Sequence, residues 1–305
     1  MKKVQILLST YNGEKYVAEQ IDSLLSQSYP ESEILIRDDG STDKTLPILQ
    51  NYTWGNNRIG IMPENNIGVV ASFLELLMKS SAEASYFAFC DQDDVWFKDK
   101  LLNGIAMIDS LPEDMPVMYC SQLEIVDVKL STLGQMPVPH RGPSFANALV
   151  QNIATGCTII VNRAARDFLL KQLPHPSSII MHDWWVYLVV SAFGKVVYDK
   201  RPQLYYRQHG SNSVGAKVDF LQRWVARIKG FYRRGRRLRL SQQAKEFQRI
   251  FAQQLPQNKA EFLDRFVNNR RTFIQRLWYA CERNVYRQSK VDTFVLKILI
   301  LFNRI

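Results

Sequence analysis

The clearest chemical feature of the sequence is a group of three carboxylates within four positions, Asp91-Gln92-Asp93-Asp94. They follow the apolar run Tyr86–Cys90, which is typical of a buried strand, so their charges repel one another strongly. A divalent cation offsets such repulsion, and Mg²⁺ and Mn²⁺ prefer oxygen ligands that they often share with substrate phosphates. The alternative is structural, because aspartates also cap helices and a helical pattern follows at 98–111.

A second acidic turn, Asp38-Asp39-Gly40-Ser41, leaves two interpretations open. Asp-Gly-Ser is ordinary turn chemistry, and Asp43 could cap a helix that follows. Alternatively, a carboxylate in this turn accepts a hydrogen bond from a nucleotide base. The run Ser9-Thr10-Tyr11 forms a third polar cluster near the N-terminus.

These clusters need elements that bring them together, and the first 110 residues alternate between strand and helix patterns. Strands are predicted at 4–8, 33–37, 58–62 and 86–90. Such alternation indicates an α/β fold with a mostly parallel sheet, flanked by helices on both faces. Ligands of such sheets bind beyond the carboxyl ends of the strands. Each polar cluster follows a predicted strand, so we expect all three at that edge.

The chain divides by charge near residue 215. Residues 1–215 hold 18 Lys/Arg and 23 Asp/Glu, whereas residues 216–305 hold 21 and 6. Residues 115–210 show mixed strand patterns and a helix that begins near His182, with no linker before them. We therefore expect one catalytic domain over 1–215 and a basic, α-helical C-terminal extension over 216–305.

Composition narrows the class of protein. Hydrophobic residues make up 46% of the chain, which supports a sizeable core and argues against disorder. The spacing of the four cysteines fits neither a metal site nor a disulfide framework, so buried thiols in a reducing compartment are expected. The first apolar run is too short for a signal peptide, and no apolar run is long enough to span a membrane. We expect a cytoplasmic catalytic part.

Three motifs resemble, in order and spacing, those of the family 2 glycosyltransferases, which have the Rossmann-like GT-A fold. The resemblance covers residues 3–215, and the segment 64–68 fits the family between the second and third motifs. The form Asp-Gln-Asp-Asp-Val-Trp, with the segments 181–185 and 206–212, resembles a rhamnosyltransferase-like branch. The three motifs are Leu8-Ser9-Thr10-Tyr11-Asn12-Gly13, Arg37-Asp38-Asp39-Gly40-Ser41-Thr42-Asp43 and Cys90-Asp91-Gln92-Asp93-Asp94-Val95-Trp96.

The resemblance implies a role for each position. Asp93 or Asp94 would bind Mn²⁺ or Mg²⁺, and His209 would contact the metal or the diphosphate. Asp183 would be the general base. Many members carry Glu where this chain has His182, so the assignment of the base rests on Asp183 alone. The nucleotide of the donor would be held by Thr10, Tyr11, Asn12, Asp38, Asp39 and Asp91.

The implied function is inverting transfer of a sugar to a glycan acceptor of a bacterial surface polysaccharide. The branch implies dTDP-L-rhamnose as the donor, and a UDP-hexose or UDP-N-acetylhexosamine is the alternative. A nucleotidyltransferase is expected to have a Gly-rich phosphate-binding loop near the N-terminus, and residues 8–13 do not form such a loop. A nucleic-acid-binding protein could use the basic extension, but that extension has no recognisable binding motif. We therefore expect no nucleic-acid partner.

The basic extension leaves three interpretations open. Phe220, Trp224, Ile228 and Phe231 recur at helical spacing beside arginines, and the apolar run 294–302 is too short to span a bilayer. These helices could lie on the cytosolic face of the inner membrane, bound to anionic lipid, near a lipid-linked acceptor. They could instead pack on the catalytic domain with solvated arginines, or form a homo-oligomer contact.

Overall fold

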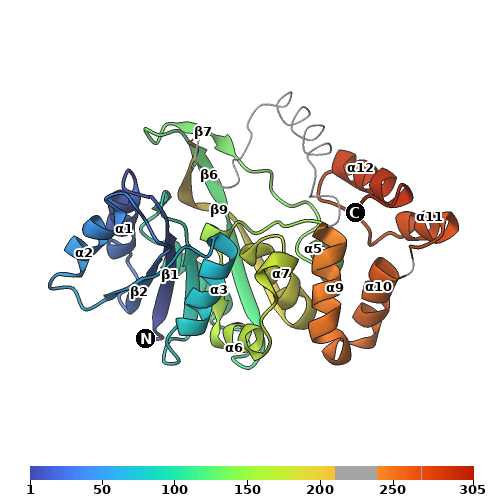
Figure 1. Cartoon of the computed structure of the whole chain (residues 1–305), viewed down its shortest axis with the longest axis horizontal. Helices are drawn as coiled ribbons and strands as arrows, with labels where there is room; N and C mark the ends of the chain where they lie inside the picture. Colours follow the sequence, from blue (N-terminus) through green and yellow to red (C-terminus); the bar gives the residue numbers. More distant parts are fainter. Residues whose placement is uncertain (210–238, 269) are drawn as a thin grey trace. The chain divides into compact units, whose positions relative to one another are not determined.

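The computed structural model describes residues 1–209, 239–268 and 270–305, and the expected stripe at 220–231 lies outside them. The chain folds into two compact units, each built from several segments (Figure 1). The sheet unit comprises Met1–Val138, Ala154–Lys171 and Lys195–Ala216. The helical unit comprises Pro139–Ile153, Gln172–Gly194 and Lys217–Ile305.

Four parallel strands form one half of the sheet, in the order β3-β2-β1-β4. Nearly every residue of β1 is buried because helices cover both faces. In register, Thr10 of β1 lies beside Asp38 of β2, and Leu8 lies beside Cys90 of β4. The three polar clusters therefore leave the sheet at one edge. The strands are β1 (Val4–Thr10), β2 (Ser32–Asp38), β3 (Ile59–Pro63) and β4 (Tyr86–Cys90).

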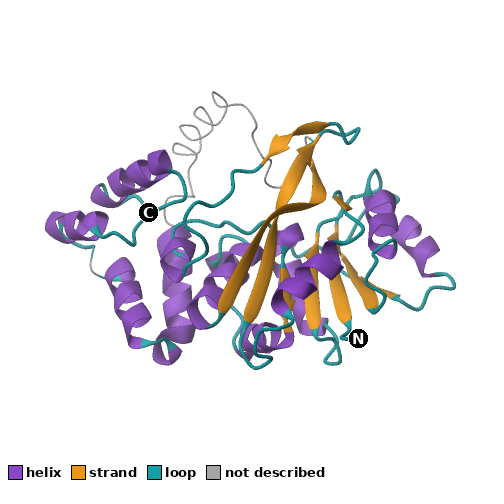
Figure 2. Cartoon of the chain, turned by 180° about the vertical axis from the view of Figure 1, so that it is seen from behind, coloured by secondary structure: helices purple, strands orange, loops and turns teal. Residues whose placement is uncertain are grey.

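The other half of the sheet is mixed, and continues in the order β8-β6-β9-β5, with β7 paired to β6. β8 is antiparallel to both β4 and β6, whereas the long β6 and β9 run parallel (Figure 2). The predicted α/β class with a GT-A-like sheet is confirmed. Among the described strands, the parallel pairs are those within β3-β2-β1-β4 and the pair β6 and β9. The strands are β5 (Val95–Trp96), β6 (Val117–Val126), β7 (Thr132–Gln135), β8 (Ile160–Asn162) and β9 (Lys195–Arg207).

Alternate residues of the strands supply two apolar layers. Ile6 and Leu8 of β1 belong to the main buried cluster, to which α1 and α4 also contribute. On the opposite face, Phe73 of α3 packs edge-on against Phe89 of β4, with ring centroids 5.8 Å apart. The helices of this unit are α1 (Val17–Leu25), α2 (Thr45–Thr53), α3 (Val69–Lys79), α4 (Lys100–Ile108) and α6 (Arg163–Lys171).

The helical unit forms around an aromatic cluster. Phe247 of α9 is fully buried, and its ring lies 5.9 Å from Trp185 and 6.3 Å from Phe193, both on α7. It also lies 5.5 Å from Phe145 of α5 and 5.1 Å from Phe251. The helices are α5 (Phe145–Ala148), α7 (His182–Phe193), α9 (Arg239–Phe251), α10 (Gln257–Val267), α11 (Phe273–Cys281) and α12 (Lys290–Leu301).

The helix α7 explains why the two units differ from the expected division at residue 215. Ten of its twelve residues are buried, so it needs apolar partners on almost all sides. The aromatic side chains of α9 supply them, which draws 172–194 to the C-terminal helices. The division into 1–215 and 216–305 stays a prediction. In the part of the chain that the structure describes, no helix is long and apolar enough to cross a membrane.

Candidate active site

The acidic loop, Asp91–Asp94, leaves β4 at the carboxyl edge and leads into β5. The helix α4 begins only at Lys100, and its N-cap residue Asp99 makes no side-chain capping bond. The loop therefore does not cap that helix, and the structural alternative raised by the sequence does not account for its carboxylates.

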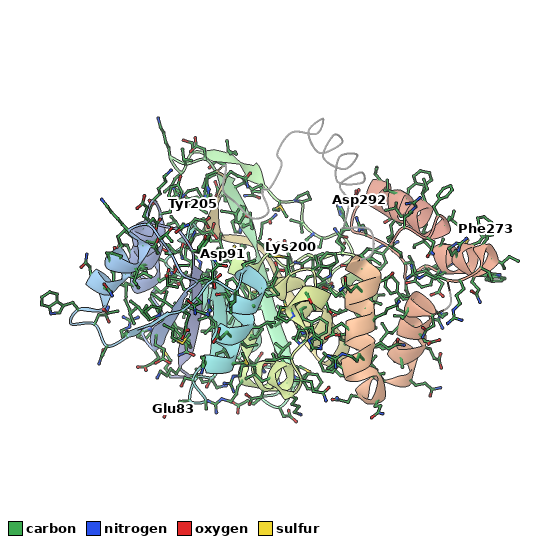
Figure 3. The ribbon with its side chains drawn as sticks, in the orientation of Figure 1. Glu83, Asp91, Lys200, Tyr205, Phe273 and Asp292 are labelled. Atoms are coloured by element: carbon green, nitrogen blue, oxygen red, sulfur yellow. The ribbon has the colours of Figure 1, made fainter. Side chains whose placement is uncertain are left out.

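Asp91, Asp94 and Cys157 offer ligand atoms that lie within 4.8 Å of one another, and Figure 3 labels Asp91. Asp94 is fully buried; Oδ1 accepts the Arg207 amide at 3.3 Å, and Oδ2 has no hydrogen-bond partner among the described residues. Burial, with the charges of Asp93 and Asp91, raises the pKa of Asp94 well above its usual range. Such a carboxylate pair fits a hard cation such as Mg²⁺ or Mn²⁺. Burial also raises the pKa of the Cys157 thiol, which keeps it protonated and a poor ligand.

Asp93 makes a different contact. Its Oδ2 lies 2.8 Å from Nε2 of His209, which is 116 residues away in the chain. The His209 ring stacks on Tyr16 with centroids 4.9 Å apart. Burial raises the pKa of Asp93, and the hydrogen bond from His209 opposes that shift. Of the residues expected to bind metal, Asp94 therefore lies close to Asp91, whereas Asp93 and His209 are hydrogen-bonded to each other.

Arg207, at the end of β9, fixes the acidic loop. Its Nε donates to the carbonyl of Asp93 at 3.0 Å, and its Nη1 donates to the carbonyl of Val128 at 2.8 Å. It also pairs with Glu19 of α1, and its Cζ lies 4.7 Å from the centroid of the Tyr16 ring. Its side chain is only 2% exposed, whereas that of Glu19 is 47% exposed, so the Arg207 end of these contacts is the shielded one. One buried cation thus joins three segments to the acidic loop.

The loop after β1 and the turn after β2 are tied together by hydrogen bonds. Asp38 accepts from Oγ1 of Thr10 at 2.9 Å and from the amide of Ser41 at 2.9 Å. The Asn12 amide donates to Oγ of Ser41 at 2.9 Å. The turn needs Gly40, whose φ of +76° favours glycine. Thr10, Asn12 and Asp38 therefore act here as scaffold for the two loops.

Asp39 holds the segment that leads into α3. Its Oδ1 accepts the Ile67 amide at 2.8 Å and a bond from Arg37, and its Oδ2 accepts the Gly68 amide at 2.9 Å. A carboxylate offers about four acceptor positions, so roughly one remains, on Oδ2. Asp39 is 3% exposed, and its main visible role is to order this segment.

Gln92 is a site residue that the sequence analysis missed. Its Oε1 accepts the Tyr11 amide at 2.8 Å, and its Nε2 donates to the Tyr11 carbonyl at 3.0 Å. A Cβ on Gly13 would lie 2.3 Å from the same Oε1, so a larger residue there would displace the end of the Gln92 side chain. The one available signal was an amide among carboxylates, because an amide can both donate and accept, whereas an ionised carboxylate can only accept. Gln92 thus joins the acidic loop to the loop after β1.

Lys100 was missed as well, because it reads as the first residue of an ordinary helix. It is fully buried, and its Nζ lies 2.9 Å from the centroid of the Trp96 ring. Nζ has no hydrogen-bond partner among the described residues. Burial lowers the pKa of Lys100 to about 7, although nearby groups that include Cys90 and Asp94 oppose the shift. The Lys100 amine therefore interacts electrostatically with the carboxylates of the acidic loop.

The expected general base, Asp183, belongs to the helical unit. It lies in the first turn of α7, is 8% exposed, and accepts the Trp184 amide at 2.6 Å. The preceding His182 is also buried, and burial lowers its pKa to about 3, so it is neutral at physiological pH. Nε1 of Trp184 donates to the Ala148 carbonyl at 2.6 Å, which orients the start of the helix.

The contact between Gln92 and Gly13 can be tested by a double-mutant cycle. Gly13→Ala should lower the free energy of unfolding by about 1–3 kcal/mol, because the new methyl group displaces Gln92. In a Gln92→Ala background the same change should cost at least about 1 kcal/mol less, since the obstructing amide is gone. Denaturant unfolding of the four proteins measures this coupling.

Gly60→Ala is the matched control for this cycle. Its added Cβ would meet only Cδ1 of Leu35, at an ordinary 3.7 Å, so its effect should be independent of Gln92. Additive costs for Gly13→Ala and Gln92→Ala would show that the two residues are not in contact.

The chain is similar in sequence to known glycosyltransferases. A family model described as glycosyl transferase family 2 matches residues 5–173. The dTDP-rhamnosyl transferase RfbG of Shigella flexneri is 28% identical, over 97% of this chain and 99% of its own. The UDP-Glc:alpha-D-GlcNAc-diphosphoundecaprenol beta-1,3-glucosyltransferase WfgD of Escherichia coli is 30% identical, over 52% of this chain and 60% of its own.

Solved structures show the same fold at low sequence identity. Staphylococcus aureus TarS 1–349 matches with a TM-score of 0.57 and 17% identity, over 99% of this chain and 89% of its own. The mannosyltransferase PcManGT of Pyrobaculum calidifontis, in complex with GDP-Man and Mn²⁺, matches with a TM-score of 0.51 and 13% identity, over 99% and 87%. The family model covers more than half of the chain, which therefore belongs to glycosyltransferase family 2.

Proposed function

We propose that this family 2 enzyme is an inverting, metal-dependent transferase that passes a sugar from a nucleotide-sugar donor to a glycan acceptor. The observation that carries the proposal is the close pair of Asp91, which is half-buried, and Asp94, which is fully buried and whose Oδ2 has no hydrogen-bond partner among the described residues. When bound, a divalent cation would neutralise the charge that a diphosphate leaving group gains. TarS has been solved with UDP-GlcNAc and with UDP, which supports a nucleotide-sugar donor.

The residues of the sheet unit bind and orient the nucleotide. Tyr11 is 48% exposed, and Gln92 fixes its backbone, so its ring is available to pack on the base or ribose. The remaining acceptor position of Asp39 suits a base N–H, while Thr10, Asn12 and Asp38 keep the loops in place. Asp93 and His209 form a polar pair beside the carboxylates, in reach of a diphosphate.

Asp183 is proposed as the base that takes the proton of the acceptor hydroxyl as that oxygen attacks the anomeric carbon. The attack is a single displacement, so the configuration inverts and no covalent enzyme intermediate forms. The buried, neutral His182 adds no positive charge beside the carboxylate, so His182 does not oppose proton uptake by Asp183.

The proposed donor is dTDP-L-rhamnose and the pathway is that of a bacterial surface polysaccharide. The similarity to RfbG over nearly the whole of both chains supports both statements. The name of WfgD specifies a UDP-Glc donor and an acceptor on diphosphoundecaprenol, which favours a UDP-sugar as the alternative donor and a lipid-linked acceptor. Such an acceptor would place the enzyme in the cytoplasm, at the cytosolic face of the inner membrane.

The first test removes the metal. EDTA should abolish sugar transfer, and Mn²⁺ or Mg²⁺ should restore it, because the leaving group needs its charge neutralised. Asp94→Ala should reduce transfer to near background in every metal tried, and Asp93→Ala should be similarly impaired. Asp114→Ala, at an exposed position of the same unit, is the control and should retain full activity. Full activity in excess EDTA would exclude metal dependence.

The second test concerns the base. Asp183→Asn keeps the shape of the side chain but cannot accept the proton, so transfer should fall about 10²–10⁴-fold while donor binding is retained. Single-turnover transfer and nucleotide titration measure the two quantities separately. Asp167→Asn, at a half-exposed carboxylate, should change neither. If Asp183→Asn transfers at the wild-type rate, another group is the base.

The third test identifies the donor. Release of nucleoside diphosphate should be fastest with dTDP-L-rhamnose in a panel that also holds UDP-glucose, UDP-N-acetylglucosamine and GDP-mannose. A UDP-hexose or UDP-N-acetylhexosamine that outperforms dTDP-L-rhamnose would overturn the rhamnose assignment and leave the rest of the proposal intact. Release of pyrophosphate in place of nucleoside diphosphate would instead indicate nucleotidyl transfer.

A further inference from the structure

The helices α11 and α12 carry large apolar side chains that no described residue covers. On α11, Phe273 is 59% exposed and Trp278 is 75% exposed (Figure 3 labels Phe273). On and just beyond α12, Phe294 is 66% exposed, Ile298 is 36% exposed and Phe302 is 72% exposed. The last three recur every four residues and so lie on one side of the helix. We call this group, with Ile274, the apolar face.

The apolar face belongs to helices that are anchored on their other side. Leu296 and Ile300 on the opposite side of α12 are buried, so the helix already packs against its unit. Nε of Arg276 on α11 donates to the Leu301 carbonyl at 2.9 Å, which ties the two helices together. Side chains cap both helices, at Thr272 and Ser289. The exposed side is therefore a second apolar surface of a packed helix pair, and such surfaces mark contact sites.

Basic residues surround the apolar face. Residues 270–305 hold eight Lys/Arg against two acidic residues. One of the two, Glu282, is already paired with Arg265 at 2.8 Å. Exposed basic residues stand at the ends of both helices, namely Arg271, Arg283, Lys290 and Arg304. We call these basic residues at the helix ends the rim of the apolar face.

This combination decides between two occupants. A second copy of the chain docked through the same face would bring two positive rims together, because a two-fold contact pairs each patch with itself. An anionic lipid surface offers an acyl region for Trp278 and Phe294 and negative headgroups for the rim. We propose that α11 and α12 form a membrane-docking surface that seats the enzyme on anionic phospholipid.

The proposal deepens the proposed function, because it gives the surface that would hold the enzyme beside a lipid-linked acceptor. The run 294–302 on α12 was expected from the sequence to lie at a membrane, whereas the part on α11 was not, and the stripe expected at 220–231 lies outside the described residues. It also has a readout that does not need sugar transfer, so failure of the catalytic proposal and failure of the docking proposal can be told apart.

The test uses the full chain and vesicles of phosphatidylcholine, with and without phosphatidylglycerol. The wild-type protein should co-sediment with the anionic vesicles at low salt, and the triple variant Trp278→Ala, Phe294→Ala and Phe302→Ala should bind about tenfold more weakly or worse. Arg271→Glu, Lys290→Glu and Arg304→Glu should each weaken binding about fivefold or more, and high salt should weaken it further. Trp54→Ala is the matched control, since Trp54 is 92% exposed but belongs to the sheet unit.

Cys281 offers a second readout at the end of α11. It is the exposed cysteine, whereas Cys90, Cys120 and Cys157 are buried, so a polarity-sensitive maleimide dye should label it selectively. Its emission should shift to the blue when anionic vesicles are added, and not in the triple variant. The triple variant should keep the wild-type melting temperature and the wild-type rate of transfer to a soluble acceptor.

Equal vesicle binding by the wild-type protein and the triple variant would overturn the proposal, as would recovery of the wild-type protein in the supernatant with and without anionic vesicles. A wild-type dimer that the triple variant converts to a monomer, with no vesicle binding by either, would assign the apolar face to a subunit contact instead.

Discussion

Carboxylates that lie side by side in a partly buried loop repel one another and lose hydration, and this constraint shapes the surroundings of Asp91–Asp94. Asp94 has no exposed surface, so donors and positive charge must come from the protein or from a bound cation. The Arg207 amide and guanidinium bond to the loop, and the Lys100 amine lies within its field. The long β9 reaches far enough to deliver both Arg207 and the neighbouring His209 to the same loop.

Shared contacts also connect the loops that follow β1, β2 and β4. The pleat of β1 sends Thr10 toward Asp38 at the end of β2 and Ser9 toward Ser72 of α3, so the two faces of one strand end contact two different elements. Gln92 then extends the pairing of β1 and β4 beyond the strand ends, since its amide bonds to both backbone groups of Tyr11. The two hydrogen bonds from the Gln92 side chain to the Tyr11 backbone therefore couple the positions of these two loops.

The parallel half of the fold was predictable because its strands are apolar, separated by amphipathic helices and followed by polar turns. In the mixed half, strand patterns were visible between 115 and 210, but the order and direction of the strands were not, because β5 has two residues and β8 has three, too few to show a period. The site divides in the same way. Carboxylates are recognisable by residue type, whereas the roles of Gln92 and Lys100 depend on contacts that only the folded backbone creates. The sequence also indicated a helix start at His182 and Asp183, but the burial that keeps His182 neutral comes from packing across the helical unit.

The helical unit is threaded by the chain three times, at 139–153, 172–194 and 217–305. A unit built in this way cannot be gained, lost or exchanged by one genetic recombination event at a single boundary. Removal of the C-terminal part would strip Phe247 and Phe251 from Trp185 and leave a nearly all-apolar α7 exposed to water. Relatives that keep this unit should therefore keep all three of its segments together.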